Sequence, residues 1–303
     1  MQNNPLANLW LFYNLRRYIR WMSGKKADWI TLTSNLFKQY QIKRNIPYLQ
    51  VNSTTLKLDV YQPKTLQPHP TLIYFHSGGW VGGKKDFELI QCIPYLQLGF
   101  AVVNVEYRLA QVALAPAAVQ DCRCALRWVI QNAQHYNFDL DKIVVSGLSA
   151  GGHLALTTGM IPASPQLDSL CPGDEALKVA AIINWYGITD VRDLLNGVNC
   201  REYAQQWMGN QTNQFELADL VSPIHYVRPN LPPILTIHGD QDSIVPYDHA
   251  VQLHQALDQV GVPNQLLTIP GGGHGKFNQE AEQHISATIR SFLSQYQLEI
   301  PQD

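Results

Sequence analysis

Short, nearly continuous apolar runs separated by helical patterns constrain this 303-residue chain more than any other feature. The runs lack the polar–apolar alternation of a half-exposed strand, and this is typical of strands buried on both faces. They occupy residues 71–77, 100–109, 142–149, 179–187, 233–240 and 265–274, and helical spacing appears at 117–135, 247–260 and 277–296. Strands that alternate with helices predict βαβ units, and therefore a mostly parallel sheet with helices on both faces.

Two further segments complete the predicted architecture. Residues 48–62 alternate polar and apolar side chains and predict an antiparallel hairpin at the sheet edge, which gives about eight strands in all. Residues 188–232 contain Pro, Asn and short apolar pieces such as "REYAQQWMG", and they exceed what a plain crossover needs. We expect a small helical insertion there, within a single domain that spans residues 46–303.

The N-terminal segment, residues 1–45, is predicted to be helical. An amphipathic helix would place Leu11, Phe12, Leu15, Ile19 and Met22 on one broad face. Its arginines follow the apolar part, which is the reverse of a signal peptide. Packing on the domain surface or forming a lid over the site is favoured, and peripheral contact with a membrane is the alternative.

Charge and cysteine content limit the partners and the compartment. The 22 Lys and Arg residues against 24 Asp and Glu residues give a net charge of −2, so the basic footprint of a nucleic-acid-binding protein is missing. No apolar run is long enough for a transmembrane helix. The five cysteines form no CxxC pair, which argues against a disulfide framework, although a single disulfide stays open. A cytoplasmic location is predicted, and the sequence does not indicate the oligomeric state.

The strongest chemical signal is "SGLSAGGHLA", residues 146–155. It contains the pattern Gly-x-Ser-x-Gly, centred on Ser149, directly after a predicted strand and before a predicted helix. This strand–turn–helix context lifts a serine hydroxyl out of the fold, and the close backbone approach at the turn requires the glycines. Because ligand sites of parallel sheets form beyond the carboxyl ends of the strands, Ser149 is the predicted nucleophile.

A serine nucleophile needs a base and an acid that orients the base, in the chain order Ser, Asp or Glu, His. His274 follows the last predicted strand within "PGGGHG" and is the predicted base. Asp242 in "HGDQDSIVP" is the predicted orienting acid, with Asp240 interpreted as a cap of the turn. Asp190 and Asp193, after an earlier strand, are the fallback acids. His153, His249, His254 and His284 are interpreted as helix residues outside the chemistry, the last three facing solvent.

The glycine loop "HSGGWVGG", residues 76–83, follows the first buried strand. Bare backbone N–H groups at Gly78 and Gly79, with that of Ala150 after the nucleophile, are the predicted oxyanion hole. His76 is interpreted as an anchor of the loop. A substrate pocket lined by Trp80, Trp185 and Tyr186 is predicted, and core packing is an equal alternative for Trp80.

These segments resemble α/β-hydrolases, in particular the esterase and lipase group that is similar to hormone-sensitive lipase and to bacterial acetyl and feruloyl-type carboxylesterases. "HSGGWVGG", "VVNVEYRLA", "GLSAGGHLA" and "GDQDSIVP…GGGHG" carry the resemblance from about residue 50 to the C-terminus. It implies an α/β-hydrolase fold with a small helical cap, a small-molecule ester substrate, and neither a metal nor an organic cofactor. Ser77 departs from the family pattern His-Gly-Gly-Gly.

The predicted function is that of a serine carboxylesterase acting on short-chain or aromatic-acid esters through an acyl-enzyme. Amide hydrolysis, as by an arylformamidase or a small peptidase, is the first alternative. The second is a non-catalytic binding protein on a hydrolase fold, which the intact set of Ser149, Asp242 and His274 argues against.

Overall fold

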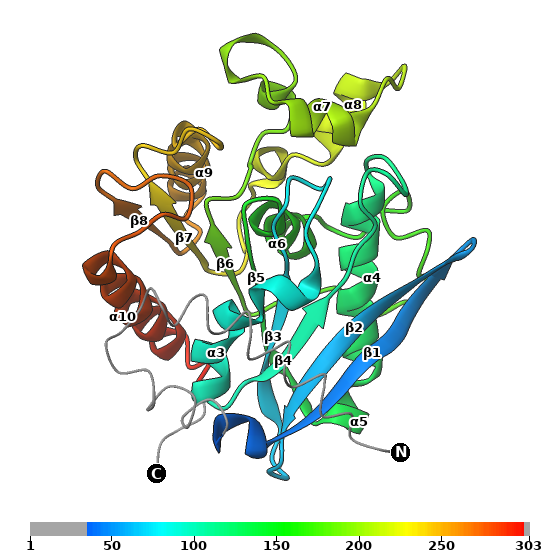
Figure 1. Cartoon of the computed structure of the whole chain (residues 1–303), viewed down its shortest axis with the longest axis vertical. Coiled ribbons are helices and arrows are strands. Elements are labelled where there is room, and N and C mark those ends of the chain that lie inside the picture. The colour runs from blue at the N-terminus through cyan, green and yellow to red at the C-terminus, as the bar shows by residue number, and fades with distance from the viewer. Residues whose placement is uncertain (1–34, 300–303) are drawn as a thin grey trace.

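Eight strands form one sheet within residues 35–299, the part of the chain that the computed structural model describes (Figure 1). The strands are β1 (Tyr40–Val51), β2 (Thr54–Pro63), β3 (His69–Phe75), β4 (Ala101–Val105), β5 (Phe138–Leu148), β6 (Ala181–Trp185), β7 (Ile234–Gly239) and β8 (Asn264–Ile269). Their order is β1-β2-β4-β3-β5-β6-β7-β8. The pairs β1–β2 and β2–β4 are antiparallel, and all the others are parallel.

Helices cover both faces of the sheet (Figure 1). The side chains of β3 show why: Leu72 and Tyr74 pack into one core, whereas Ile73 and Phe75 pack into the other. The first core includes α3 (Leu89–Gln97) and α10 (Gln279–Gln295), and the second includes α4 (Ala117–Gln131), α6 (Ala150–Met160) and α9 (Asp248–Gln259). A short helix, α5 (Ala133–Tyr136), precedes β5. A strand buried on both faces needs apolar side chains in both directions, which explains the continuous apolar runs.

The predicted strands and the edge hairpin are confirmed, with ends that differ by a few residues. One boundary was wrong: β1 begins at Tyr40, so residues 40–45 are strand rather than part of an N-terminal helical segment. Residues 35–38 of that predicted segment are helical, and residues 1–34 lie outside the described residues. Within residues 35–299, no helix is both long enough and apolar enough to cross a bilayer.

The segment between β6 and β7 carries several short helices. They are η2 (Arg192–Leu194), η3 (Gly197–Asn199), α7 (Glu202–Met208), α8 (Gln214–Leu220) and η4 (Pro223–Tyr226). In Figure 1, α7 and α8 stand at the top of the view, above the end of the sheet toward which β6 points. They form the small helical cap.

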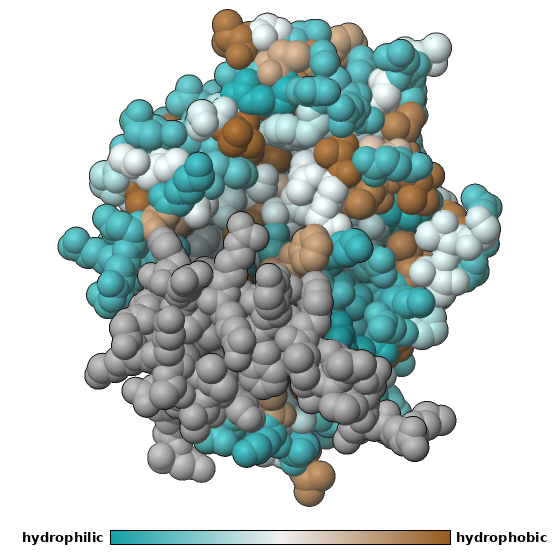
Figure 2. Space-filling model, viewed as in Figure 1, coloured by the Kyte–Doolittle hydropathy of each residue, from teal (hydrophilic) through white to brown (hydrophobic). Residues whose placement is uncertain are grey.

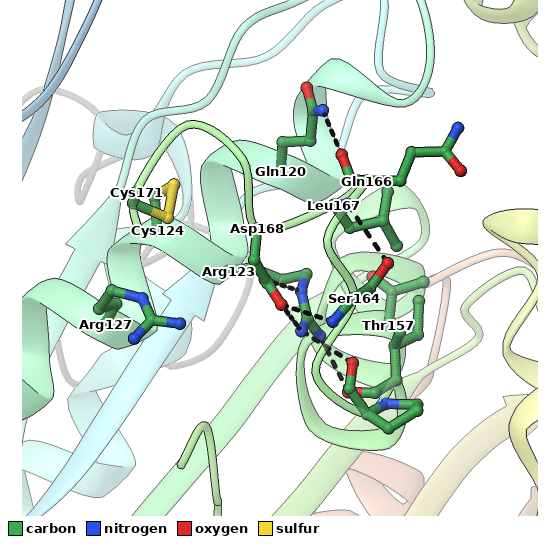
Figure 3. A network of polar contacts seen from close by, with 12 residues as sticks. Gln120, Arg123, Cys124, Arg127, Thr157, Ser164, Gln166, Leu167, Asp168 and Cys171 are labelled. Atoms are coloured by element: carbon green, nitrogen blue, oxygen red, sulfur yellow. Dashed lines mark hydrogen bonds and ion pairs between the residues drawn. A yellow bond between two sulfur atoms is a disulfide. The ribbon is translucent and has the colours of Figure 1, made fainter. Parts of the chain in front are cut away.

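A disulfide joins α4 to the segment between α6 and β6 (Figure 3). It links Cys124 to Cys171, which lie 47 residues apart in the sequence. Two ion pairs reinforce the same junction: the buried Arg123 guanidinium donates to Asp168, and Arg127 donates to Glu175, each with a nitrogen–oxygen distance of 2.7 Å. The sequence did not decide whether a single disulfide forms, and the structure contains one.

Candidate active site

Ser149 occupies the sharp turn between β5 and α6. Its φ of 56° and ψ of −117° lie in a region that side-chain-bearing residues rarely adopt, which is the strained conformation expected of a nucleophile at such a turn. The Ser149 N–H donates to the carbonyl oxygen of Trp185 at 2.9 Å. This bond joins the turn to the end of the neighbouring strand β6.

The glycines on either side of Ser149 are required by close backbone contacts. A Cβ atom on Gly147 would lie 2.5 Å from backbone atoms of Gly151 and Phe75, and one on Gly151 would lie 2.1 Å from the Phe75 carbonyl oxygen. Both distances are far below a van der Waals contact, so only glycine fits. Since Phe75 ends β3 and the glycine loop begins at His76, the serine turn and that loop pack directly together.

Asp242 and His274 lie together at the ends of adjacent strands β7 and β8. The Nδ1 atom of His274 lies 2.7 Å from Oδ2 of Asp242. The other carboxylate oxygen accepts the N–H groups of Ile244 at 2.8 Å and Val245 at 3.0 Å. In the neutral tautomer that donates Nδ1–H to Asp242, Nε2 of His274 is the acceptor nitrogen, which is the form that a general base requires.

The Asp242 carboxylate is fully buried, whereas the His274 side chain is 21% exposed. Burial raises the pKa of Asp242, but hydrogen bonds from the His238 and His274 side chains and from the Ile244 N–H outweigh it and hold the pKa well below the usual range. The Nε2 atom of His238 lies 3.3 Å from the same Oδ2 atom and 3.2 Å from the Val245 carbonyl oxygen. Asp242 therefore stays ionised near neutral pH, as an orienting acid must.

The glycine loop holds its backbone donors in a half-buried conformation with positive φ values, which glycine adopts readily. Gly78 and Gly79 have φ values of 123° and 60°, and neither N–H has an acceptor among the residues that the structure describes. His76 acts as an anchor: its Nδ1–H donates to the Ser77 carbonyl oxygen at 2.7 Å, and its ring stacks on Tyr107. Burial lowers the pKa of His76 to about 4, so the ring is neutral. The unpaired N–H groups have the chemistry of an oxyanion hole.

Trp80 is packed in the core, which supports the second of its two interpretations, and contact with a substrate stays a prediction. Its side chain has no exposed surface. The indole stacks on Trp207 of α7 with ring centroids 4.1 Å apart, and its Nε1–H donates to Nδ1 of His153 at 3.2 Å. His153 in turn donates Nε2–H to the Val221 carbonyl oxygen. Trp80 and His153 thus tie the glycine loop and α6 to the cap.

The other two predicted pocket residues lie at the end of β6. Tyr186 packs its ring edge against His274 with centroids 4.6 Å apart, so it borders the predicted base. Trp185 lines a cavity of about 460 Å³ between α3 and α10. Both side chains are largely buried. Contact with a substrate stays a prediction for each.

Tyr203 of α7 lies beside the candidate site, and the sequence analysis did not identify it. A Cβ atom on Gly79 would lie 3.0 Å from Cβ and Cγ of Tyr203, so this side chain covers the glycine loop. Its hydroxyl donates to the Ile244 carbonyl oxygen at 3.3 Å, and Arg201 donates to the same oxygen at 2.9 Å. The segment "REYAQQWMG" carries no motif, so only the position of the insertion in the chain could have indicated that Tyr203 lies near the site.

The surface near the cap is partly hydrophobic. Figure 2 shows apolar side chains gathered just below α7 and α8. The exposed apolar residues include Ile244 after β7, Val198 in the insertion, and Val112 and Leu114 before α4. An apolar substrate group would therefore meet a compatible surface beside the site.

The remaining candidates lie elsewhere. Asp240 accepts the Gly271 N–H at 2.7 Å and caps the turn as predicted. His249 is buried rather than solvent-facing, because its Nε2 pairs with Asp193 at 3.0 Å, and this pairing occupies one of the fallback acids. His254 is also buried, against Asn264. Over residues 35–299, no group of His, Cys, Asp and Glu side chains is arranged to hold a metal ion.

The sheet, the serine turn and the Asp–His pair on successive strand ends define the class of protein: this is an α/β-hydrolase. The chain belongs to the BD-FAE family, whose model matches residues 58–257. It is similar to Esterase LipC of Mycobacterium tuberculosis, with 30% identity over 72% of this chain and 56% of LipC. It is also similar to ethyl acetate hydrolase of Pseudomonas putida, with 28% identity over 78% of each. The chain spans 54–58% of the mycobacterial relatives LipC, LipQ and LipM.

Solved structures of bacterial esterases share the fold. Esterase 2 of Thermogutta terrifontis with bound propionate superposes with a TM-score of 0.72 and 27% identity, over 88% of this chain and 98% of that one. A truncated carbohydrate esterase from gut microbiota gives a TM-score of 0.69 and 28% identity, over 84% and 96%.

Proposed function

We propose that the chain is a serine carboxylesterase. The observation that carries the proposal is the 2.7 Å bond between His274 and the buried Asp242, together with the strained turn that presents Ser149. This combination supplies a nucleophile and a base held in the correct tautomer. The relatives named as esterases support the same chemistry.

In the proposed reaction, Ser149 Oγ attacks the ester carbonyl carbon while Nε2 of His274 takes the hydroxyl proton. The carbonyl oxygen becomes an oxyanion, which the N–H groups of Gly78, Gly79 and Ala150 stabilise. His274 then gives its proton to the leaving alcohol oxygen, and the acyl-enzyme remains. Water repeats the sequence, releasing the carboxylic acid and restoring Ser149.

Short acyl groups are the proposed substrate class. The Thermogutta esterase binds propionate in one structure and butyrate in another, and the Pseudomonas relative is named for ethyl acetate. The Tyr203 side chain over Gly79 narrows the space beside the oxyanion loop, which suits a small acyl group.

The cytoplasmic location stays a prediction, and one observation counts against it. Disulfides persist mainly in oxidising compartments, so the Cys124–Cys171 bond favours such a compartment.

The test compares the wild-type protein with Ser149→Ala. We expect the wild type to hydrolyse p-nitrophenyl acetate and butyrate, and a fluorophosphonate probe to label it once. Ser149→Ala should lose both properties, whereas Ser243→Ala, at an exposed serine beside the same site, should keep both. Hydrolysis by Ser149→Ala at the wild-type rate would refute the nucleophile assignment. Faster turnover of N-formylkynurenine or an aminoacyl-anilide than of any ester would favour amide hydrolysis.

A further inference from the structure

Ser77, the residue that departs from the family pattern, is held by a carboxylate. Its backbone N–H lies 3.1 Å from both carboxylate oxygens of Glu88, and its hydroxyl donates to Oε1 of the same group. A glycine at this position would keep the first interaction and lose the second. Ser77 directly precedes Gly78, so both bonds act on the backbone that presents the predicted oxyanion donors.

Glu88 ends the short 3-10 helix η1 (Lys85–Glu88) and immediately precedes α3. Besides Ser77, it accepts the Tyr74 hydroxyl at 3.0 Å on Oε2. The Glu88 carboxylate thus accepts hydrogen bonds from Tyr74, near the end of β3, and from Ser77 in the loop that follows this strand. Burial raises the pKa of Glu88, and the bonds from Ser77 and Tyr74 oppose that rise.

This arrangement determines which N–H groups of the glycine loop remain available to bind an oxyanion. The Ser77 N–H is directed at Glu88 and is removed from the oxyanion hole. The Gly78 and Gly79 N–H groups have no acceptor within residues 35–299. Glycine backbones are conformationally permissive, so their orientation depends on fixed neighbours. Such donors stabilise an oxyanion well only when their positions are set before the reaction.

We propose that Glu88 is a positioning residue for the oxyanion loop and acts through Ser77. The carboxylate holds Ser77, which directly precedes Gly78, and this sets the direction of the Gly78 and Gly79 N–H groups. The inference rests on the proposed esterase function, and it assigns Ser77 a role that a plain glycine loop lacks.

The experiment measures kcat and KM for p-nitrophenyl butyrate, and the inhibition constant of a trifluoromethyl ketone, whose adduct with serine carries an oxyanion. Glu88→Ala removes every bond to Ser77, and Ser77→Ala removes only the hydroxyl bond. Glu88→Gln keeps one acceptor oxygen. Tyr74→Phe is the matched control, because it deletes a bond to the same carboxylate without touching the loop.

For Glu88→Ala we expect kcat to fall about tenfold, which is less than the roughly 10²- to 10³-fold loss of a whole oxyanion donor. KM should change less than about twofold, and the inhibition constant should rise by the same factor by which kcat/KM falls. Ser77→Ala should lose about threefold in kcat, Glu88→Gln should recover part of the Glu88→Ala loss, and Tyr74→Phe should stay within about twofold of wild type.

The proposal is overturned if folded Glu88→Ala keeps kcat within twofold of wild type, or if Tyr74→Phe loses as much as Glu88→Ala. Thermal melting and stoichiometric fluorophosphonate labelling establish that each variant is folded. If Glu88→Ala does not fold, Ser77→Ala decides: unchanged kcat and inhibition constant refute the role. An inactive wild type would instead refute the esterase function itself.

Discussion

Replacing Asp242 by asparagine should abolish nearly all activity while leaving the fold in place. The Asn carbonyl oxygen can occupy the position of Oδ1 and keep the N–H bonds from Ile244 and Val245. Its NH2 group then takes the position of Oδ2, 2.7 Å from Nδ1 of His274. An amide NH2 cannot accept a hydrogen bond, so the imidazole must place its own proton on Nε2, the nitrogen that the proposed mechanism needs unprotonated.

The expected loss follows from that wrong tautomer. A base that already carries the proton cannot accept one from the serine hydroxyl, and equivalent substitutions in serine hydrolases lower kcat by about 10⁴-fold. At about 1.4 kcal/mol for each factor of ten, this is about 5.5 kcal/mol of activation free energy. Binding of the substrate does not involve Asp242, so KM should change little.

The assay is steady-state hydrolysis of p-nitrophenyl butyrate, with thermal melting to monitor the fold. Asp240→Asn is the control, because Asp240 lies in the same turn but caps the Gly271 N–H instead of holding the imidazole. It should stay within about threefold of wild-type kcat, far from the loss that a wrong tautomer causes. A folded Asp242→Asn with more than a tenth of wild-type kcat, or an equal loss in Asp240→Asn, would refute the reasoning.

Two further predictions concern stability and acyl selectivity. Replacing Cys124 and Cys171 together by serine should lower the free energy of unfolding by about 4 kcal/mol, because the disulfide closes a loop across a 47-residue separation. Urea denaturation with and without a reductant measures this loss. A loss below about 1 kcal/mol would contradict this account. Tyr203→Ala removes the ring over Gly79 and should raise the octanoyl-to-acetyl ratio of kcat/KM about tenfold, whereas Tyr203→Phe, which keeps the ring, should not. An unchanged ratio in Tyr203→Ala would show that the ring does not limit the acyl group.

The strand pattern and the residues after each strand were readable from the sequence because both are local properties. Apolar runs report burial on two faces, and a serine between glycines reports a tight turn. Parallel strands bring their carboxyl ends to one edge, so Asp242 and His274 could be paired although they lie 32 positions apart in the chain. The structure brings Asp242 and His274 into direct contact, and their catalytic roles stay a prediction.

Errors arose where a distant segment decides the environment of a residue. Trp80 is buried because Trp207 of the cap stacks on it, and no residue near Trp80 in the sequence indicates that partner. His249 faces inward because Asp193, in a different segment, accepts its Nε2–H. Helical periodicity indicates which face of a helix is apolar, but it does not indicate which polar group of a neighbouring element contacts that helix.

The cap contacts both the loop after β3 and the loop after β7, and we expect these contacts to affect acyl selectivity. Tyr203 packs on Gly79 of the oxyanion loop after β3 and donates to the Ile244 carbonyl oxygen in the acid loop after β7. Arg201 reinforces the second contact. We therefore expect a change of sequence in this short helix to alter both the space beside Gly79 and the spacing of the loops after β3 and β7. Acyl selectivity should consequently depend on α7, where the sequence carries no motif, more than on the triad, where it carries a strong one.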